Sequence, residues 1–151
     1  MLSKEMVSSG KVVEAAKLMQ KCFELKLHGT DFLMQHSIQD LAKAYNGIGP
    51  EWMPKELRKA IDALSPALKP AAFIHDARYT FSDGSREQFN AANDELEANG
   101  LLIADTLYKW WDIRRYITRF KAKAYADLCK RFGWEAYNRG CAEHNVLNAA
   151  S

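Results

Sequence analysis

The sequence has few cysteines and no long apolar run, and both absences exclude classes of protein. Its three cysteines, Cys22, Cys129 and Cys141, are odd in number and widely spaced, which excludes a disulfide framework and a Cys-x-x-Cys metal site. No window approaches the roughly 18 apolar residues of a membrane span, and the N-terminal residues lack an apolar stretch of signal-peptide length. We therefore expect a soluble chain in a reducing compartment that is not exported by the standard route.

A net charge of one sign is also nearly absent. The 21 basic and 19 acidic residues leave +2 at pH 7, which is too little for a chain whose task is bulk polyanion binding. The charge is unevenly placed, because residues 109–131 hold eight basic and two acidic residues, a local charge of +6. This stretch is therefore expected to face different surroundings from the rest of the chain.

Strand signals are missing as well. The 151 residues contain no alternating apolar and polar run between hairpin turns, no internal repeat and no low-complexity segment, whereas apolar residues recur at helical spacing. This pattern predicts one all-α domain of six or seven helices. The helices are expected over 12–27, 32–44, 54–64, 71–81, 86–99 and 101–132, with a shorter one after Gly133 to about residue 140.

Residues at the ends of these segments indicate where two of the helices begin and end. Thr30 and Asp31 supply N-cap oxygens for the helix over 32–44. Ser85 and Gln88 fit a capping box at the start of the helix over 86–99. Gly100 is expected to end that helix.

A glycine-containing loop follows the second predicted helix. Gly47 and Gly49 lack side chains, so the backbone carbonyls around them could turn inward. A hard cation such as calcium could bind several of these oxygens together with a carboxylate, for which Asp76 is the candidate. The alternative is an ordinary turn at Asn46 and Gly47 that ends the helix before Pro50.

The next feature is the His-Asp-Ala-Arg-Tyr segment over 75–79. Adjacent ionisable groups beside Phe73 and Ile74 are costly to bury unless a charged or hydrogen-bonding partner meets them. On a helix His75 and Tyr79 share a face, whereas Asp76 points about 100° away and could serve a different partner. The alternative is a structural pair at the surface.

Together, the loop and the segment resemble the phospholipase A2 superfamily, in which a Tyr-x-Gly-x-Gly loop precedes a His-Asp-x-x-Tyr helix. In this chain the two motifs stand at 45–49 and 75–79. The resemblance implies that the calcium ligands are Tyr45, Gly47, Gly49 and Asp76. It also implies that His75 is the general base that activates water and that Tyr79 orients the group supporting this histidine.

The likeness extends towards small phage- and prophage-encoded phospholipase A2-like proteins. Their Asn-Gly-x-Gly loop, proline before the His-Asp helix, acidic helix and basic tail are similar to residues 46–50, Pro70, 93–96 and 125–140. The resemblance covers about residues 42–141. It implies a phospholipase A2-like helical domain over 42–151 and an N-terminal helical extension over 1–41, packed as one unit, in the cytoplasm of a bacterial host or in a phage particle.

The chain departs from the family pattern in the loop and at the second carboxylate. Ile48 and the Ala72-Phe73 pair stand where the family has two cysteines that pair, so that disulfide cannot form. Asn93 stands at the position of the family's second aspartate, and Asp94 follows one residue later, about 100° around a helix. Asn93 and Asp94 are therefore alternative partners for orienting the catalytic histidine.

The function that the resemblance implies is calcium-dependent hydrolysis of phospholipid ester bonds. His75 would take a proton from water and calcium would stabilise the oxyanion, which agrees with the lack of a Gly-x-Ser-x-Gly elbow. One alternative is a non-catalytic phage accessory or structural protein with the same fold. The other is an HD-type metal-dependent phosphohydrolase, whose site would use His36, His75, Asp76 and either Asp105 or Asp112.

Aromatic and basic residues are interleaved over 108–120. On a helix such a segment suits an interface with anionic lipid, because aromatic rings sit at headgroup depth and cations meet phosphates; the expected partner is a phospholipid or membrane surface. The alternative, favoured by three- and four-residue spacing, is that Trp110, Ile113, Ile117 and Phe120 belong to the core. No base-reading motif accompanies the charge, so no specific nucleic acid is expected.

Overall fold

The computed structural model describes residues 8–45, 55–56, 59, 63 and 65–150, and these residues form helices and connecting turns without any strand. This confirms the all-α prediction. The elements are α1 (Ser9–Glu24), α2 (Thr30–Leu33), α3 (Ile38–Ala44), the 3-10 helix η1 (Pro66–Leu68), α5 (Lys69–Thr80), α6 (Arg86–Leu107) and α7 (Ile113–Ala150). The helix expected over 54–64 lies largely outside the described residues. None of the helices in the described part is long and apolar enough to cross a membrane.

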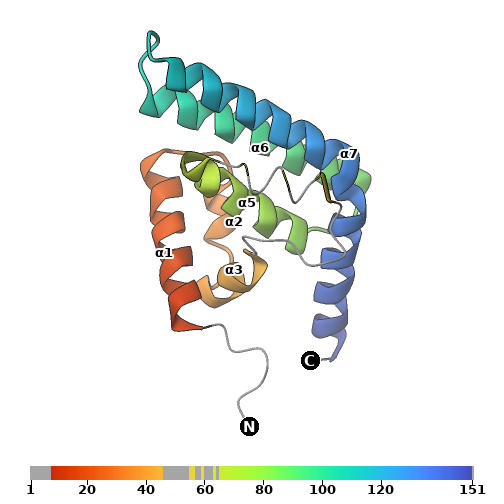
Figure 1. Cartoon of the computed structure of the whole chain (residues 1–151). Helices are drawn as coiled ribbons and strands as arrows, with labels where there is room; N and C mark the ends of the chain where they lie inside the picture. The colour runs from red at the N-terminus through yellow and green to blue at the C-terminus, as the bar shows by residue number, and fades with distance from the viewer. Residues whose placement is uncertain (1–7, 46–54, 57–58, 60–62, 64, 151) are drawn as a thin grey trace.

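Helices α6 and α7 form a long hairpin that lies across the rest of the molecule (Figure 1). Helix α5 runs beneath this hairpin and packs against both of its helices. Helices α1, α2 and α3 also pack on α5, so α5 is enclosed by the other elements. Within the segment over 75–79, which belongs to α5, His75 and Ala77 are therefore buried, whereas Asp76, Arg78 and Tyr79 are partly exposed.

One hydrophobic core draws on all of these helices. Its buried members include Cys22, Leu33, Leu41, Phe73, Ile74, Leu96, Ile103, Ala122 and Ala126. The fully buried amide of Asn99 accepts a hydrogen bond from the backbone N–H of His28 at 2.8 Å and donates to the carbonyl of His28 at 2.9 Å. The connection between α1 and α2 is thereby fixed to α6, and the first helices share the core of the remaining chain.

The single helix predicted over 32–44 is wrong. It is divided into α2 and α3 at Ser37, whose side chain accepts a hydrogen bond from the backbone N–H of Asp40 at 3.1 Å and caps α3. Thr30 lies inside α2, and Gly29 occupies the N-cap position with φ +97°. A Cβ at Gly29 would lie 2.8 Å from the Ile74 side chain, so both the left-handed backbone and the approach to α5 require glycine here.

The predicted helix end at Gly100 is also wrong. Helix α6 continues through Gly100, the chain turns over 108–112, and α7 continues through Gly133, so the expected helix over 101–132 does not exist as one element. A Cβ at Gly100 would lie 2.5 Å from the Cβ of Ala122, and one at Gly133 would lie 2.7 Å from the Tyr79 hydroxyl. Both glycines therefore allow close packing between helices and do not mark helix ends.

The predicted start of α6 is confirmed. The Ser85 side chain accepts a hydrogen bond from the backbone N–H of Gln88 at 3.1 Å. The reciprocal half of the expected capping box is replaced, because the Gln88 side chain accepts from the backbone N–H of Asp83 at 2.8 Å. The cap fixes the helical register from which the next turns of α6 face α5.

The turn of the hairpin and the first turns of α7 carry large exposed side chains. Trp110, Ile113, Ile117 and Phe120 are all exposed, so the prediction that they belong to the core is wrong. Helix α7 packs on α6, and the small residues Thr118, Ala122 and Ala126 of α7 are buried. These small residues form the side of α7 that packs on the protein, and the large apolar side chains lie on the side that is exposed to solvent.

Candidate active site

The candidate site is built where α5 meets α6. His75 of α5 is 3% exposed and Asn93 of α6 is fully buried. The imidazole Nε2 of His75 and the amide Oδ1 of Asn93 are 2.8 Å apart. Two residues that lie 18 positions apart in the sequence are therefore joined by a buried side-chain hydrogen bond.

Tyr79 adds a second hydrogen bond to the same amide oxygen. It lies one helical turn after His75, and its hydroxyl donates to Asn93 Oδ1 at 2.7 Å. The two rings are in contact, with centroids 4.1 Å apart. Burial raises the pKa of Tyr79 well above its ordinary value, so the hydroxyl keeps its proton and remains a donor. The structure thus brings together three of the four predicted catalytic residues.

This arrangement determines which nitrogen of His75 carries the proton. Because Asn93 Oδ1 is an acceptor, Nε2 must donate, and in neutral imidazole the other nitrogen then offers a lone pair. That nitrogen, Nδ1, is buried and has no hydrogen-bond partner among the described residues. It lies 3.9 Å from Oδ1 of Asp76. The site therefore presents a base nitrogen beside a carboxylate.

Asp94, the other of the two alternative partners, does not lie beside His75. Its side chain is 72% exposed, and its carboxylate is 3.3 Å from the ammonium group of Lys130 on α7. Asn93 is turned inward because it shares a face of α6 with the buried residues Phe89 and Leu96. Of the two alternatives, the structure thus places the amide beside the histidine.

Tyr125 of α7, to which the sequence assigned no role in the site, also contacts His75. The rings of Tyr125 and His75 meet edge to face with centroids 6.3 Å apart, and Cys129 lies one turn further along α7 and is also buried. Burial raises the pKa of the Tyr125 hydroxyl and of the Cys129 thiol, so both groups are protonated. Their four-residue spacing, continued by Gly133, is the signal that could have placed them on one inward face.

The predicted calcium ligands are only partly within the described residues. Gly47 and Gly49 lie outside them. Tyr45 ends α3, and its ring packs edge to face on Phe73 with centroids 5.6 Å apart. Burial, together with the negative charge of Asp76, raises the pKa of the Tyr45 hydroxyl to about 12. Tyr45 therefore packs on α5, the helix that carries Asp76.

Part of what a calcium ion needs is present beside His75. Asp76 offers a hard carboxylate that is partly exposed, and the adjacent His75 Nδ1 has no hydrogen-bond partner among the described residues, which fits calcium and an activated water. Within the described ranges, no three His, Cys, Asp or Glu residues form a group that could hold a metal ion. Any further calcium oxygens would therefore come from backbone carbonyls, from amide or hydroxyl side chains, or from residues outside these ranges.

The residues of the alternative phosphohydrolase site are engaged in other contacts. The His36 ring stacks on Phe81 with centroids 4.1 Å apart. Asp105 forms ion pairs with two arginines of α7, and Asp112 forms one with Arg114. None of these contacts involves His75, so the structure gives no support to this site.

No family model matches the chain, and no curated protein or solved structure matches it either.

Proposed function

We propose that the chain is a calcium-dependent, phospholipase A2-like hydrolase of phospholipid ester bonds. The observation that carries this proposal is the hydrogen bond from His75 Nε2 to Asn93, which leaves Nδ1 as an unpartnered base among the described residues. The same three residues, His75, Tyr79 and Asn93, stand at the positions that the family pattern assigns to the base and its support. The sequence motif and the side-chain geometry therefore agree on one group of residues.

The chemistry of the site follows from the hydrogen bonds. His75 Nδ1 would accept a proton from a water molecule as that water attacks an ester carbonyl. Asn93 Oδ1 keeps the ring oriented and accepts from Nε2 throughout, while Tyr79 fixes the amide. The carboxylate of Asp76, 3.9 Å from Nδ1, would face the positive charge that the ring gains with the proton.

A calcium ion would be held by Asp76 together with backbone carbonyls of the Tyr45 loop, as the resemblance implies. When bound, this ion supplies positive charge that polarises the ester carbonyl and stabilises its developing oxyanion. His75 on α5 would then receive the proton, and Asn93 on α6 would hold the imidazole in place.

The test is fatty acid release from a short-chain phosphatidylcholine kept in monomeric form, with millimolar calcium or with a chelator. We expect release that requires calcium and falls about 100-fold or more in His75→Gln, the range for loss of a general base. His28→Gln is the matched control, because His28 is exposed. No release by the folded wild-type protein, or equal release by His75→Gln, would overturn the proposal.

A second variant separates chemistry from folding. In Asn93→Asp a carboxylate would replace the amide opposite Nε2, and it would stabilise the protonated ring more strongly than an amide does. We expect release to rise about tenfold, equivalent to about one pKa unit or 1.4 kcal/mol. A folded Asn93→Asp protein with unchanged or lower activity would argue against His75 as the base.

A non-catalytic accessory protein with this fold is the second candidate function. It is favoured by the neutral Asn93 at the position of the family's carboxylate, because an amide gives weaker support to a protonated histidine. The same assay separates the two functions, since an accessory protein would release no fatty acid as wild type and none as Asn93→Asp.

A further inference from the structure

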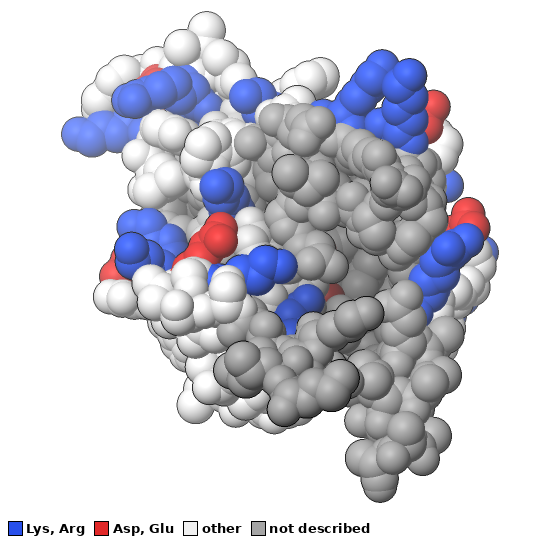
Figure 2. Space-filling model, turned by 60° about the horizontal axis from the view of Figure 1, so that its bottom comes forward, with Lys and Arg blue, Asp and Glu red and all other residues white. Residues whose placement is uncertain are grey.

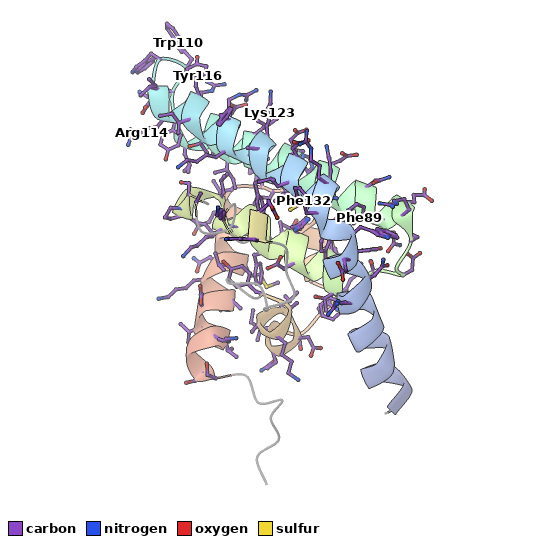
Figure 3. The ribbon with its side chains drawn as sticks, turned by 45° about the vertical axis from the view of Figure 1, so that its right-hand side comes forward. Phe89, Trp110, Arg114, Tyr116, Lys123 and Phe132 are labelled. Atoms are coloured by element: carbon purple, nitrogen blue, oxygen red, sulfur yellow. The ribbon has the colours of Figure 1, made fainter. Side chains whose placement is uncertain are left out.

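The far end of the α6–α7 hairpin carries the largest group of exposed apolar side chains in the described part of the chain. Trp110 in the turn is 70% exposed, and Ile113 at the start of α7 is 71% exposed. Tyr116, Ile117 and Phe120 on the next turns are exposed as well. Figure 3 shows Trp110 projecting beyond the end of the hairpin and Tyr116 beside it. We call this region, residues 108–123, the hairpin tip.

The apolar side chains of the tip lie on one side of α7. At about 100° per residue, Ile113, Tyr116, Ile117 and Phe120 fall within an arc of about 100°. Thr118 and Ala122, which are buried, lie on the opposite side of the helix. This part of α7 therefore has a packed side and, opposite it, an apolar stripe that is exposed to solvent.

Basic side chains flank this stripe on both sides. At the same helical spacing, Arg114 and Lys121 lie along one edge, and Arg119 and Lys123 lie along the other. Residues 105–123 hold six basic and two acidic residues, a local charge of +4. An apolar stripe between two basic edges is the pattern of a helix that lies in the interface of an anionic membrane.

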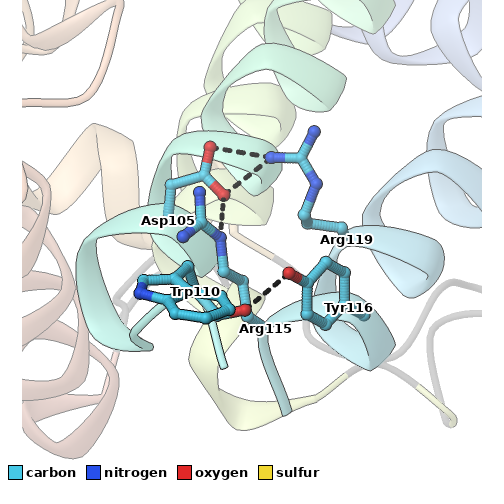
Figure 4. Close-up of polar contacts among 5 residues, drawn as sticks. All are labelled: Asp105, Trp110, Arg115, Tyr116 and Arg119. Carbon is cyan, nitrogen blue, oxygen red and sulfur yellow. Dashed lines mark hydrogen bonds and ion pairs between the residues drawn. The ribbon is translucent and has the colours of Figure 1, made fainter. Parts of the chain in front are cut away.

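The two acidic residues near the tip are both neutralised by arginines. Asp105 is 2.9 Å from Arg115 and 2.7 Å from Arg119 (Figure 4). Although partial burial opposes it, hydrogen bonds from these arginines hold the pKa of Asp105 below its usual value. Asp112 is 2.6 Å from Arg114. Lys121 and Lys123 form no ion pair with any described residue, so their charges are available to a partner.

The tip is also ordered by its own contacts. The Tyr116 hydroxyl donates to the backbone carbonyl of Trp110 at 2.5 Å (Figure 4), which ties the turn to the first turns of α7. The rings of Trp110 and Trp111 meet edge to face with centroids 5.7 Å apart, and the ammonium group of Lys109 lies 5.0 Å from the Trp111 ring. The aromatic side chains are therefore held in place before any partner binds.

We propose that the hairpin tip docks onto the surface of a membrane that contains anionic phospholipid. The indole rings would sit at headgroup depth, the apolar stripe would enter the boundary of the acyl chains, and the flanking lysines would meet phosphates. A second copy of the chain is a poorer occupant, because two segments over 105–123, each of charge +4, repel one another. A nucleic acid would leave the apolar stripe in water.

On the face in Figure 2, the described Lys and Arg side chains form separate groups, several of them beside acidic ones. The inference names a membrane partner for the proposed hydrolase, but it rests on the tip alone and does not need His75 to be catalytic.

The test is flotation of the full-length protein with vesicles of phosphatidylcholine alone or mixed with phosphatidylglycerol. We expect binding to the anionic vesicles that weakens with salt, and little binding to the neutral ones. The pair Lys121→Gln and Lys123→Gln should weaken binding about tenfold to thirtyfold. The matched control pair is Lys17→Gln and Lys43→Gln, which are exposed on α1 and α3 and should bind like wild type.

The apolar contribution is tested with Trp110→Ala and Trp111→Ala combined, which should weaken vesicle binding at least tenfold while leaving hydrolysis of the monomeric substrate unchanged. Equal binding of wild type to neutral and anionic vesicles, no vesicle binding, or equal binding by the tip variants would overturn the proposal. A dimer that the tryptophan variants dissociate, or tip-dependent retention on DNA without vesicle binding, would also overturn it. Binding without hydrolysis would contradict only the hydrolase proposal.

Discussion

Replacing Asn93 by alanine tests the hydrogen-bond network on which the candidate site depends. The substitution removes an oxygen that accepts from His75 Nε2 at 2.8 Å and from the Tyr79 hydroxyl at 2.7 Å. Both donors would then be buried without a partner, at about 1–3 kcal/mol each. The Nδ2 group of Asn93 already lacks a partner among the described residues, so its removal recovers about 1–3 kcal/mol.

The net cost is read against a matched control on the same helix. Asn90→Ala, at an exposed position of α6, changes helix propensity by the same amount without touching the site. Because the propensity terms cancel, we expect Asn93→Ala to be less stable than Asn90→Ala by about 1–3 kcal/mol. The assay is urea unfolding followed by circular dichroism, with the two variants compared at a common slope.

A double-mutant cycle with Tyr79→Phe identifies the source of this cost. Once the Asn93 oxygen is gone, removing the Tyr79 hydroxyl relieves one unpartnered donor, so the two substitutions together should cost less than their sum by about 1 kcal/mol. The reasoning would be refuted if Asn93→Ala were as stable as Asn90→Ala, or if the two substitutions were additive.

Two further predictions concern packing and alkaline stability. Gly100→Ala places a Cβ 2.5 Å from that of Ala122, whereas in the control Gly10→Ala the new Cβ meets nothing within 4 Å. Both variants gain helix propensity, so Gly100→Ala should be less stable than Gly10→Ala by about 1–3 kcal/mol. Equal midpoints of urea unfolding would contradict this. Burial raises the pKa values of Tyr45, to about 12, and of Tyr125. The stability linked to these hydroxyls is therefore present below the unfolded pKa of about 10 and lost as the pH rises above it. Phenolate absorbance should show these hydroxyls ionising only as the protein unfolds; ionisation at the ordinary pKa in the folded protein would disprove it.

Helix positions that depend on local chemistry could be predicted from the sequence. Ser85 was identified as a cap because a short side-chain oxygen satisfies a backbone donor wherever it precedes a helix. The packing role of Gly100 and Gly133 could not be predicted in this way, because a glycine at a helix end and a glycine at a close helix contact look the same in the sequence. The difference lies in Ala122 and Tyr79, which are distant in sequence and meet these glycines only in the folded chain.

The two faces of α7 show a similar ambiguity. The spacing of Ile113, Ile117 and Phe120 indicates an apolar side of a helix, but spacing alone does not say whether that side meets protein or solvent. Thr118 and Ala122 are small, and small residues let α6 and α7 approach closely, so they form the packed side.

The placement of Asn93 was within reach of the sequence. Phe89 and Leu96 lie four residues before and three residues after it, which puts all three on one face of α6, whereas Asp94 falls off that face. Calcium binding and ester hydrolysis remain predictions, because they involve a bound ion and a substrate as well as the side chains.

The bond between the Asn99 amide and both backbone groups of His28 bears on any attempt to trim the chain. A fragment starting at residue 42 would lack His28 and would leave this amide without either partner. It would also lack Gly29, which lies so close to Ile74 that a Cβ there would be 2.8 Å from its side chain, and Ile74 would lose that cover. The residues ahead of the family-like motifs are thus not an appendage, because α1 and α2 pack on α5, the helix that carries His75.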